Sequence, residues 1–476
     1  MPAASPSMKR FSMSRLRINW PVLVLGTLAC LAALALHARS LCCPYLYWDD
    51  FEILLQSYTW QETRAHLWVP VNEHCWPLTR LGTWALVSAA DRPRAVPWAA
   101  MVQARVVLVA GLVLLYVFVR REFAHPFHGM VALTIFGVSA AYQQAVNWFA
   151  ATPALPTLCM TLLALLAAQR WRQEGRLRHL ALAAGWSALA PGWYGGGILT
   201  GPLACLYLLY PPRRGRIWHC LAPLLGSVAF LAVSLPLSGK EIWHADHYGS
   251  KNAAEAFEPL TGLINTGRSV VDNVLLGAVG ISGFTCPPWV VIVCLIMLTV
   301  AGVWWWRRTS DHRLFVLGLA LILLNYWLIY SARAGWPYDI QLRAWSRYNV
   351  FPQLGLALIV CSGLRPAPVA EPSPALSLGQ IRLLAGLILI LFVVNWPRGY
   401  FGTLECDPDQ ARVFARVDEI DARCRAYRIS AADARRVLEN IDMPGGGCDN
   451  PWRFLRGSAN PIPHTEAETR ELLQLP

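Results

Sequence analysis

The chain has 476 residues, of which 55% are hydrophobic and only 15% are charged. Soluble domains carry about 25% charged residues, so this composition excludes an ordinary soluble protein and predicts a membrane protein. The net charge of +12 can indicate binding to nucleic acid, but here it follows the expected membrane topology.

About eleven apolar segments approach the length of roughly 17–25 residues that a bilayer-spanning helix needs. They occupy residues 19–38, 97–119, 129–147, 152–169, 180–191, 195–210, 217–237, 288–306, 314–330, 348–363 and 382–396. The fifth and sixth are short and are interrupted by a run rich in Gly from Pro191 to Gly197. An alternative is one long kinked helix, which would reverse the orientation of everything that follows.

The charges of the loops decide between these alternatives, because loops on the inner side of a membrane are rich in Lys and Arg. With eleven spans and an inner N-terminus, the inner segments carry 18 basic and four acidic residues, a net charge of +14 that leaves −2 for the rest of the chain. This predicts a multi-pass protein of the cytoplasmic (inner) membrane. Two long loops, 39–96 and 238–287, then lie outside, and the basic balance requires no nucleic-acid partner.

The first apolar segment has a basic flank, as a signal peptide would. Its apolar core is long, however, and Leu36 is a poor residue at the −3 position before Ala38, so we predict a retained signal-anchor. In the first exterior loop, residues 51–55 and 76–86 have the spacing of helices that lie flat in the membrane interface. Residues 260–279 predict a further interfacial or re-entrant helix.

Residues 398–476 are predicted to form a soluble exterior tail with two short helices. The predicted fold is therefore an all-α polytopic membrane protein, with a transmembrane domain over 1–397 and a helical tail over 398–476. Seven of the 13 cysteines fall outside. An exterior compartment would allow disulfides, and the odd number leaves at least one cysteine unpaired.

Two adjacent carboxylates, Asp49 and Asp50, lie in the first exterior loop between aromatic residues. Acidic residues at this depth are costly unless something uses them. One carboxylate can act as the general base that removes a proton from an acceptor hydroxyl, while its neighbour orients it. The structural alternative is a helix cap, because Asp49 stands three residues before Glu52.

Basic residues in the other exterior loops are candidates for binding a lipid phosphate. Arg333, Arg343 and Arg347 share the loop at 331–347, and Lys240 lies near the start of the loop at 238–287. Arginine offers a planar set of donors that stabilises growing charge on a phosphate. The alternatives are anchoring to lipid headgroups or pairing with Asp339.

Several other polar residues have less specific signals. Glu73 and His74 either bind the acceptor or organise the first loop, and Arg105, inside the second segment, is expected to snorkel outward or to pair with an acid. The two histidines at 244 and 247 do not have the spacing of a zinc site. The sequence requires no cofactor and leaves the use of a divalent metal open.

The order of features along the chain resembles the GT-C superfamily: a short basic N-terminus, one helix, and then an exterior acidic pair before an interfacial helix. These are integral-membrane glycosyltransferases that use polyprenyl-phosphate sugars, and they include the protein O-mannosyltransferases and the lipid A aminoarabinose transferases. The run Asn-Glu-His-Cys-Trp-Pro-Leu at 72–78 and the run Arg-Tyr-Asn-Val-Phe-Pro at 347–352 are similar to two further motifs of this group. The resemblance covers roughly residues 10–400, through topology and motif order.

The resemblance implies that Asp49 is the catalytic base, that Asp50 supports it, and that the reaction inverts the sugar with the lipid phosphate as leaving group. Some relatives carry another acid in the second exterior loop. Here residues 147–152 read Asn-Trp-Phe-Ala-Ala-Thr and contain none, which puts a second acid or a metal role at that position in doubt.

The expected function is thus transfer of a sugar from a polyprenyl-phosphate donor to an exterior acceptor in the cell envelope, with membrane lipids around the enzyme. Whether the acceptor is a lipid, a glycan or a protein stays open. Two alternatives are a transporter or flippase of lipid-linked substrates and a non-catalytic membrane scaffold.

Overall fold

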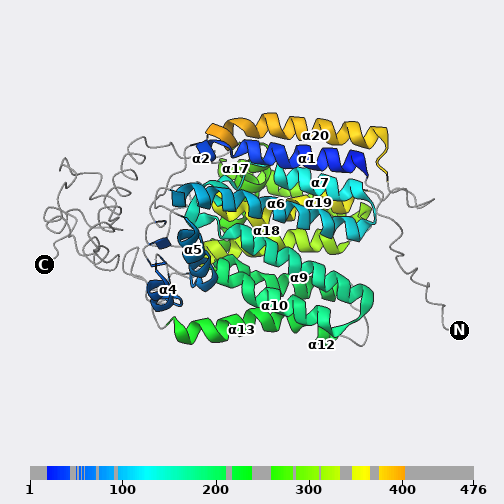
Figure 1. Ribbon diagram of the computed structural model, residues 1–476. Coiled ribbons are helices and arrows are strands. Elements are labelled where there is room, and N and C mark those ends of the chain that lie inside the picture. The colour runs from blue at the N-terminus through cyan, green and yellow to red at the C-terminus, as the bar shows by residue number, and fades with distance from the viewer. Residues whose placement is uncertain are drawn as a thin grey trace, which may run out of the picture.

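The structure is a computed structural model that describes residues 19–42, 50, 53–54, 56–57, 59–70, 74–90, 95–210, 217–238, 259–281, 286–309, 312–332, 346–364 and 375–401. Every element within these ranges is helical. Most of the helices lie alongside one another in one bundle (Figure 1). The described part of the chain therefore confirms the predicted all-α class.

The longer helices follow the predicted apolar segments. They are α1 (Trp20–Leu36), α6 (Ala95–Phe123), α7 (Pro126–Gly137), α9 (Ala154–Glu174), α10 (Leu177–Trp193), α11 (Thr200–Leu209), α13 (Ala222–Leu237), α17 (Pro288–Arg308), α18 (His312–Ala332), α19 (Val350–Gly363) and α20 (Leu378–Trp396). Each of the segments expected from the sequence overlaps one of these helices.

Shorter elements connect them. They are α2 (Arg39–Cys42), α4 (Trp60–His66), α5 (Pro77–Ala89), α8 (Gln143–Asn147), η1 (Phe149–Ala151), η2 (Gly195–Leu199), α12 (Ile217–Cys220), α15 (Pro259–Ser269), the π-helical turn η3 (Val270–Leu275), α16 (Leu276–Ala278), η5 (Ser346–Asn349) and the π-helical turn η6 (Pro397–Phe401). The predicted helices at 76–86 and 260–279 correspond to α5 and to α15 with its continuation. The rest of the predicted tail, from residue 402 onward, lies outside the described residues.

Five helical stretches among the described residues are long and apolar enough to cross a membrane. They are Ala95–Phe123, Phe149–Glu174, Pro288–Arg307, His312–Ser331 and Leu378–Tyr400, and shorter apolar helices of 10–17 residues accompany them. Helices of this length and composition are typical of multi-pass membrane proteins.

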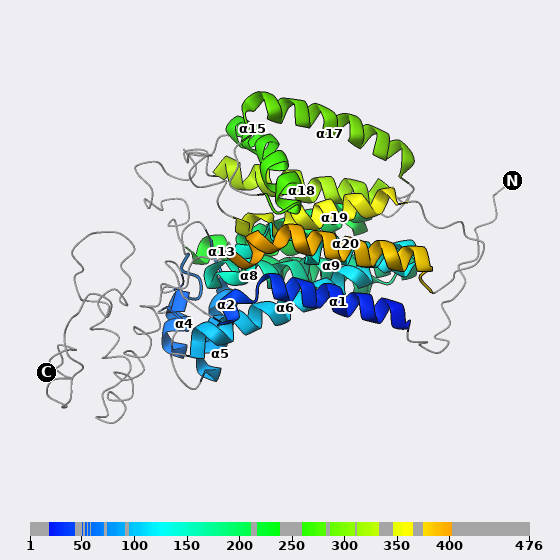
Figure 2. The same cartoon turned by 90° about the horizontal axis from the view of Figure 1, so that it is seen from above.

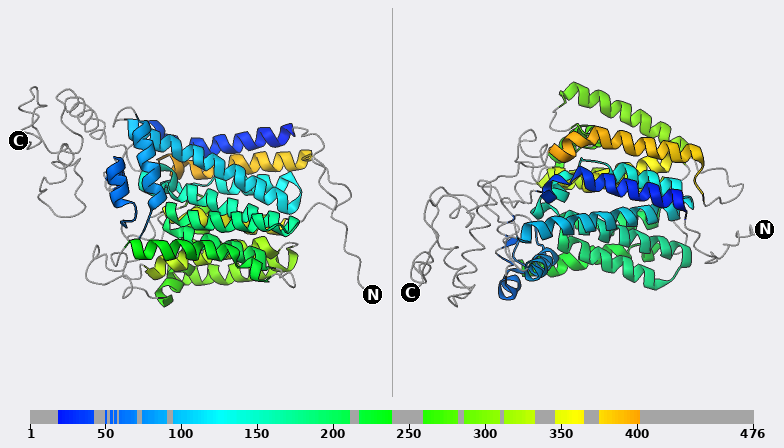
Figure 3. Two further views of the ribbon diagram at one scale, coloured as in Figure 1. Left: turned by 60° about the horizontal axis from the view of Figure 1, so that its bottom comes forward. Right: turned by 45° about the horizontal axis from the view of Figure 1, so that its top comes forward.

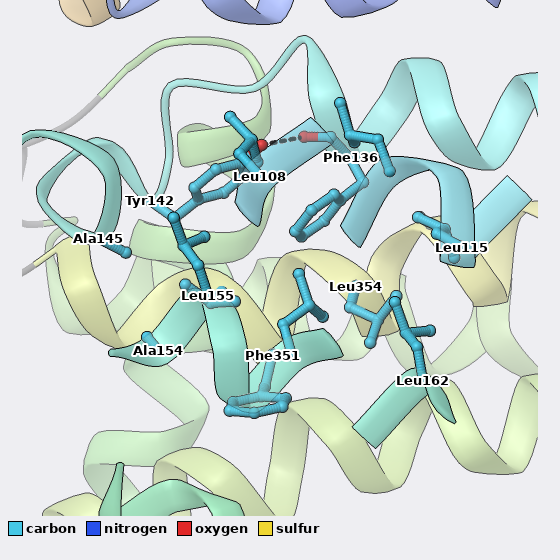
Figure 4. Close-up of a cluster of buried hydrophobic side chains, with 14 of the residues drawn as sticks. Leu108, Leu115, Phe136, Tyr142, Ala145, Ala154, Leu155, Leu162, Phe351 and Leu354 are labelled. Atoms are coloured by element: carbon cyan, nitrogen blue, oxygen red, sulfur yellow. Dashed lines mark hydrogen bonds between the residues drawn. The ribbon is translucent and has the colours of Figure 1, made fainter. Parts of the chain in front are cut away.

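The predicted segment 129–147 is broken in the structure, because α7 ends at Gly137 and α8 starts only at Gln143. Tyr142 is fully buried between them, stacks on Phe136 with ring centroids 4.8 Å apart, and donates a hydrogen bond of 2.8 Å to the Phe136 carbonyl (Figure 4). The backbone released by the break is satisfied from distant helices: Asn395 Oδ1 accepts from the Ala140 amide, and Asn349 Nδ2 donates to the Ala141 carbonyl. Buried backbone groups need such partners.

The fifth and sixth segments are two helices, as the loop charges predicted. Pro191 lies inside α10, and the chain turns only after Trp193 into η2 and α11. A methyl group on Gly197 would collide with the Ala190 carbonyl, so glycine permits the close approach at this turn.

The core lies among α6, α7, α9 and α19. Leu108, Phe136, Leu155 and Leu354 are fully buried there and point toward one another (Figure 4). Helix α1 packs beside α20 at one edge of this core (Figure 1). Helix α17 lies at the periphery (Figure 2), with large apolar side chains exposed along it, as expected for a surface that faces lipid.

The two ends of the bundle differ in character. Helices α2, α4, α5 and α8 gather at one end, where α4 and α5 lie across the ends of the longer helices (Figures 2 and 3). At the other end, Gln169 near the end of α9 bonds Glu122 near the end of α6, and Arg313 at the start of α18 lies 3.4 Å from the same carboxylate. Arg120, Arg121 and Arg172, in the last turns of α6 and α9, lie at this same end.

Candidate functional site

A short stretch at the first of these ends contacts two of the predicted site residues, Asp50 and Arg347. We call residues Gln143–Ala151, which comprise α8 and η1, the hub segment. It follows the break after α7, and its residues make hydrogen bonds with groups before α2, in α6 and in η5. Parts of the chain more than 200 residues apart therefore meet on nine consecutive residues.

Asp50 is fully buried against the hub segment. Its Oδ1 accepts a hydrogen bond of 2.7 Å from the backbone N–H of Ala150. The amides of the first turn of a helix lack intrahelical partners, so the carboxylate binds one of the unpaired amides at the start of η1. Asp50 therefore joins the hub segment to the loop that carries Asp49 and Asp50, which we call the acidic loop.

Arg347 reaches the same segment from η5. Its guanidinium carbon lies 4.5 Å from the ring centroid of Trp148 and 5.0 Å from that of Tyr348, whose hydroxyl accepts from Nη2 at 3.1 Å. The backbone is fixed as well, because the Arg347 amide donates to Gln144 Oε1 at 3.3 Å. Asp50 and Arg347 thus act on residues only two positions apart, Ala150 and Trp148.

His74 lies in an aromatic cluster beside these groups. Its ring is stacked on Trp76 at 5.0 Å and lies 5.4 Å from Tyr194, at the turn after α10. A methyl group on Gly195 would lie 2.5 Å from His74 Nδ1, so glycine makes this approach possible. Burial raises the pKa of the Tyr194 hydroxyl above its usual range and nearby Tyr348 adds to this shift, whereas Arg347 opposes it. The aromatic cluster and the Arg347 cluster are therefore neighbours.

Arg105 forms the buried connection beneath the site, with only 4% of its surface exposed. It donates to the His37 carbonyl at 2.6 Å, to the Val146 carbonyl at 3.0 Å, to Asn147 Oδ1 at 2.8 Å and to the Ser40 hydroxyl. These bonds join the end of α1, where carbonyls lack intrahelical partners, to the hub segment.

The sequence had indicated Arg105 as unusual, but it did not indicate these partners. The hydrogen bonds within the described residues go to uncharged oxygens, such as the His37 carbonyl and Asn147 Oδ1. A local signal existed in Asn147, a polar residue within an apolar run, and Ser40 donates a further 2.7 Å bond to its Oδ1. A main-chain partner such as the His37 carbonyl leaves no trace in the side-chain pattern.

The remaining predicted site residues, Asp49, Glu73, Lys240, Arg333 and Arg343, lie outside the described residues. So do the histidines at 244 and 247. Within the described ranges, no group of three or more His, Cys, Asp or Glu side chains could hold a metal ion.

No protein-family model matches the chain, and a search of curated proteins finds no match. Function is therefore inferred from the residues and their geometry.

Proposed function

We propose that the chain is a membrane glycosyltransferase of GT-C type. It transfers a sugar from a polyprenyl-phosphate donor to an acceptor on the exterior side of the cytoplasmic membrane. The single observation that carries this proposal is the placement of Asp50 and Arg347 on the hub segment, at one end of a helical bundle.

Arg347 binds the donor phosphate in this proposal. Negative charge grows on the bridging phosphate oxygen as its bond to the sugar breaks, and a guanidinium held in advance stabilises that charge without further reorganisation. Trp148 and Tyr348 supply the aromatic faces that hold the cation in place. Arg333, Arg343 and Lys240 are proposed to add positive charge around the same phosphate.

Asp49 is the proposed general base. It removes the proton from the acceptor hydroxyl, whose oxygen attacks the anomeric carbon opposite the departing phosphate, so the configuration inverts. The burial of Asp50 and its bond to Ala150 suit a residue that positions its neighbour rather than one that exchanges protons with substrate. Asp50 is thus a positioning residue.

The aromatic cluster supplies a surface for the sugar. The rings come from His74 and Trp76, just before α5, and from Tyr194, at the turn after α10. Flat apolar ring faces suit the C–H faces of a pyranose, while Glu73 is proposed to bind a hydroxyl of the acceptor or to order this loop. No cofactor is required by these steps.

The proposed topology has eleven spans, with the N-terminus inside and the C-terminal tail outside. The arginine-rich end of the bundle would face the cytoplasm, because inner loops are enriched in basic residues. The hub segment lies at the opposite end and would face the exterior. The five long apolar stretches and the shorter helices between them support this arrangement.

A transporter or flippase of lipid-linked substrates is the second candidate. Arg105 favours it, because a buried charge within a candidate span is a common mark of a transport path. Movement of a lipid-linked sugar across vesicles without any sugar transfer would establish this alternative. Removal of residues 398–476 tests the scaffold alternative: loss of a partner complex with retained transfer would assign a separate role to the tail.

The test of the proposed enzyme is turnover by purified protein with a polyprenyl-phosphate sugar. We expect Asp49→Asn to abolish transfer while the protein remains folded. Glu174→Gln is the matched control, because Glu174 is a partly exposed acid at the opposite end of the bundle. Turnover by Asp49→Asn at the wild-type rate would contradict the mechanism.

A further inference from the structure

A cavity of about 130 Å³ lies between α5, α6, α9 and α10, next to the hub segment. Its wall is mainly apolar and includes Ala104, Val107, Phe149, Pro156 and Trp193. For comparison, an apolar protein cavity of about 150 Å³ stays dry and binds benzene. The space therefore suits a few carbons of a hydrocarbon chain.

Two of the four polar side chains in the wall bind to protein carbonyls. The Thr79 hydroxyl donates to the Trp193 carbonyl at 2.6 Å, and the Thr152 hydroxyl donates to the Phe149 carbonyl at 2.8 Å. A carbohydrate in this space would have to give up its bonds to water for few new partners. The cavity thus disfavours a polar glycan and favours an apolar group.

The cavity wall reaches the exposed surface of α6. Gln103, in its wall, is exposed, and the neighbouring Val106 is 63% exposed. Trp98, two turns earlier on α6, is also exposed, as is common for tryptophans at the membrane boundary. A lipid chain would enter sideways, from the surface that faces the bilayer.

Two substrates would reach the hub segment from different sides. Arg347 arrives from η5, between α18 and α19, and contacts Trp148. The cavity is lined by a different set of helices. Its wall includes Phe149, which precedes the Asp50-bound Ala150, and Thr152, two residues after it. If the donor phosphate binds Arg347, the cavity remains for the second substrate.

We propose that this cavity holds a hydrocarbon chain of the acceptor, so that the acceptor is a membrane lipid with a hydroxyl in its headgroup. This inference rests on the proposed function and narrows its acceptor class. The hydrocarbon chain of the lipid lies between α5 and α6, and the headgroup hydroxyl lies near the acidic loop. The new bond joins that oxygen to the sugar, the sugar–phosphate bond breaks, and the hydroxyl proton passes to Asp49.

The cavity can be blocked without touching the acidic loop. Gln103→Trp covers the mouth from an exposed position, and Ala104→Phe fills the interior. Because Ala104 is buried and a large side chain there can disturb folding, Gln103→Trp is the decisive variant. Ala110→Phe is the matched control, since it adds a ring to an exposed position of the same helix.

The probe is a vesicle of phosphatidylglycerol that carries a photoactivatable diazirine in one acyl chain. We expect crosslinks on the peptide around Thr152 and Pro156 in the wild type and in Ala110→Phe. Crosslinking falls about tenfold in Gln103→Trp, because the tryptophan displaces about two methylene groups of the lipid chain from the cavity, and losing their burial weakens binding about tenfold. Radiolabelled sugar from the donor appears in the lipid fraction, and this transfer falls with the crosslinking.

Each other outcome overturns a defined statement. Wild-type crosslinking or wild-type lipid transfer in Gln103→Trp overturns the cavity assignment. Sugar found only on added oligosaccharide or on peptide overturns the lipid acceptor but leaves the glycosyltransferase intact. Crosslinking without transfer to any acceptor overturns the proposed function itself.

Discussion

Replacement of Arg105 by methionine tests the buried connection beneath the site. Methionine fills a similar length but supplies no donors, so the carbonyls of His37 and Val146 and the side chains of Ser40 and Asn147 each lose a bond. We expect the end of α1 to separate from the hub segment. Stability and transfer activity should then fall together, because the acidic loop begins just after α2.

The magnitude follows from these four bonds between segments. Neutral side-chain hydrogen bonds in membrane proteins average about 0.6 kcal/mol each, and bonds from a charged donor reach about 1.5 kcal/mol or more. Four bonds therefore predict a loss of about 2–6 kcal/mol in the free energy of unfolding. The bond to the Met101 carbonyl, one turn earlier in the same helix, is not included because it joins no second element.

The assay is reversible unfolding of the purified protein in mixed micelles, followed by tryptophan fluorescence. Arg120→Met, in the last turn of the same helix, is the matched control, because Arg120 is exposed and contacts only its own turn through Tyr116 among the described aromatic residues. It should change stability by less than about 0.5 kcal/mol. If Arg105→Met unfolds within about 0.5 kcal/mol of the wild type, Arg105 does not hold α1 to the hub segment.

Three further predictions concern the same end of the bundle and its core. Asp50→Ala should lower the free energy of unfolding by about 1.5–3 kcal/mol, because the buried amide of Ala150 loses its charged acceptor. Asp50→Asn can still accept this hydrogen bond and should lower the free energy of unfolding by less. Equal decreases in the two variants would contradict the bond. Gly226→Ala places a methyl group against a backbone carbonyl of α10 and should lower the free energy of unfolding by about 1–3 kcal/mol. A methyl group at Gly185 meets no atom within 4 Å, so Gly185→Ala should be neutral or stabilising. Thermal unfolding of the two variants measures the difference. Among single-cysteine variants, maleimide should label exposed Cys42 at neutral pH but should label Cys75 only as the pH rises toward 11. Burial raises the pKa of the Cys75 thiol to about 11, and the thiolate is the form that reacts. Fast labelling of Cys75 at neutral pH would refute this prediction.

The helices could be predicted because each apolar run carries its own signal of length and composition. The break at residues 138–142 could not, since it depends on side chains from other helices. Asn349 and Asn395, more than 200 residues away in the sequence, satisfy the backbone of Ala140 and Ala141. No local pattern records such a long-range bond.

Two of the predicted site residues, Asp50 and Arg347, contact the hub segment, which the sequence did not predict. Asp50 and Arg347 stand out in the sequence because only 15% of its residues are charged. The hub segment carries no acid and reads as a continuation of an apolar run, although it binds both residues through a main-chain amide and a tryptophan ring. Backbone donors and aromatic faces have no distinctive sequence signal, so only the folded chain reveals them.

The most direct test of the proposed reaction is the rate at which purified protein releases polyprenyl phosphate from a polyprenyl-phosphate sugar in the presence of acceptor lipids. We predict release by the wild type and by Arg120→Ala, and a fall of about 10²–10³ in Arg347→Ala, as when one preorganised donor to a developing charge is removed. Release by Arg347→Ala at the wild-type rate, or no release by the folded wild type, would contradict the proposed function.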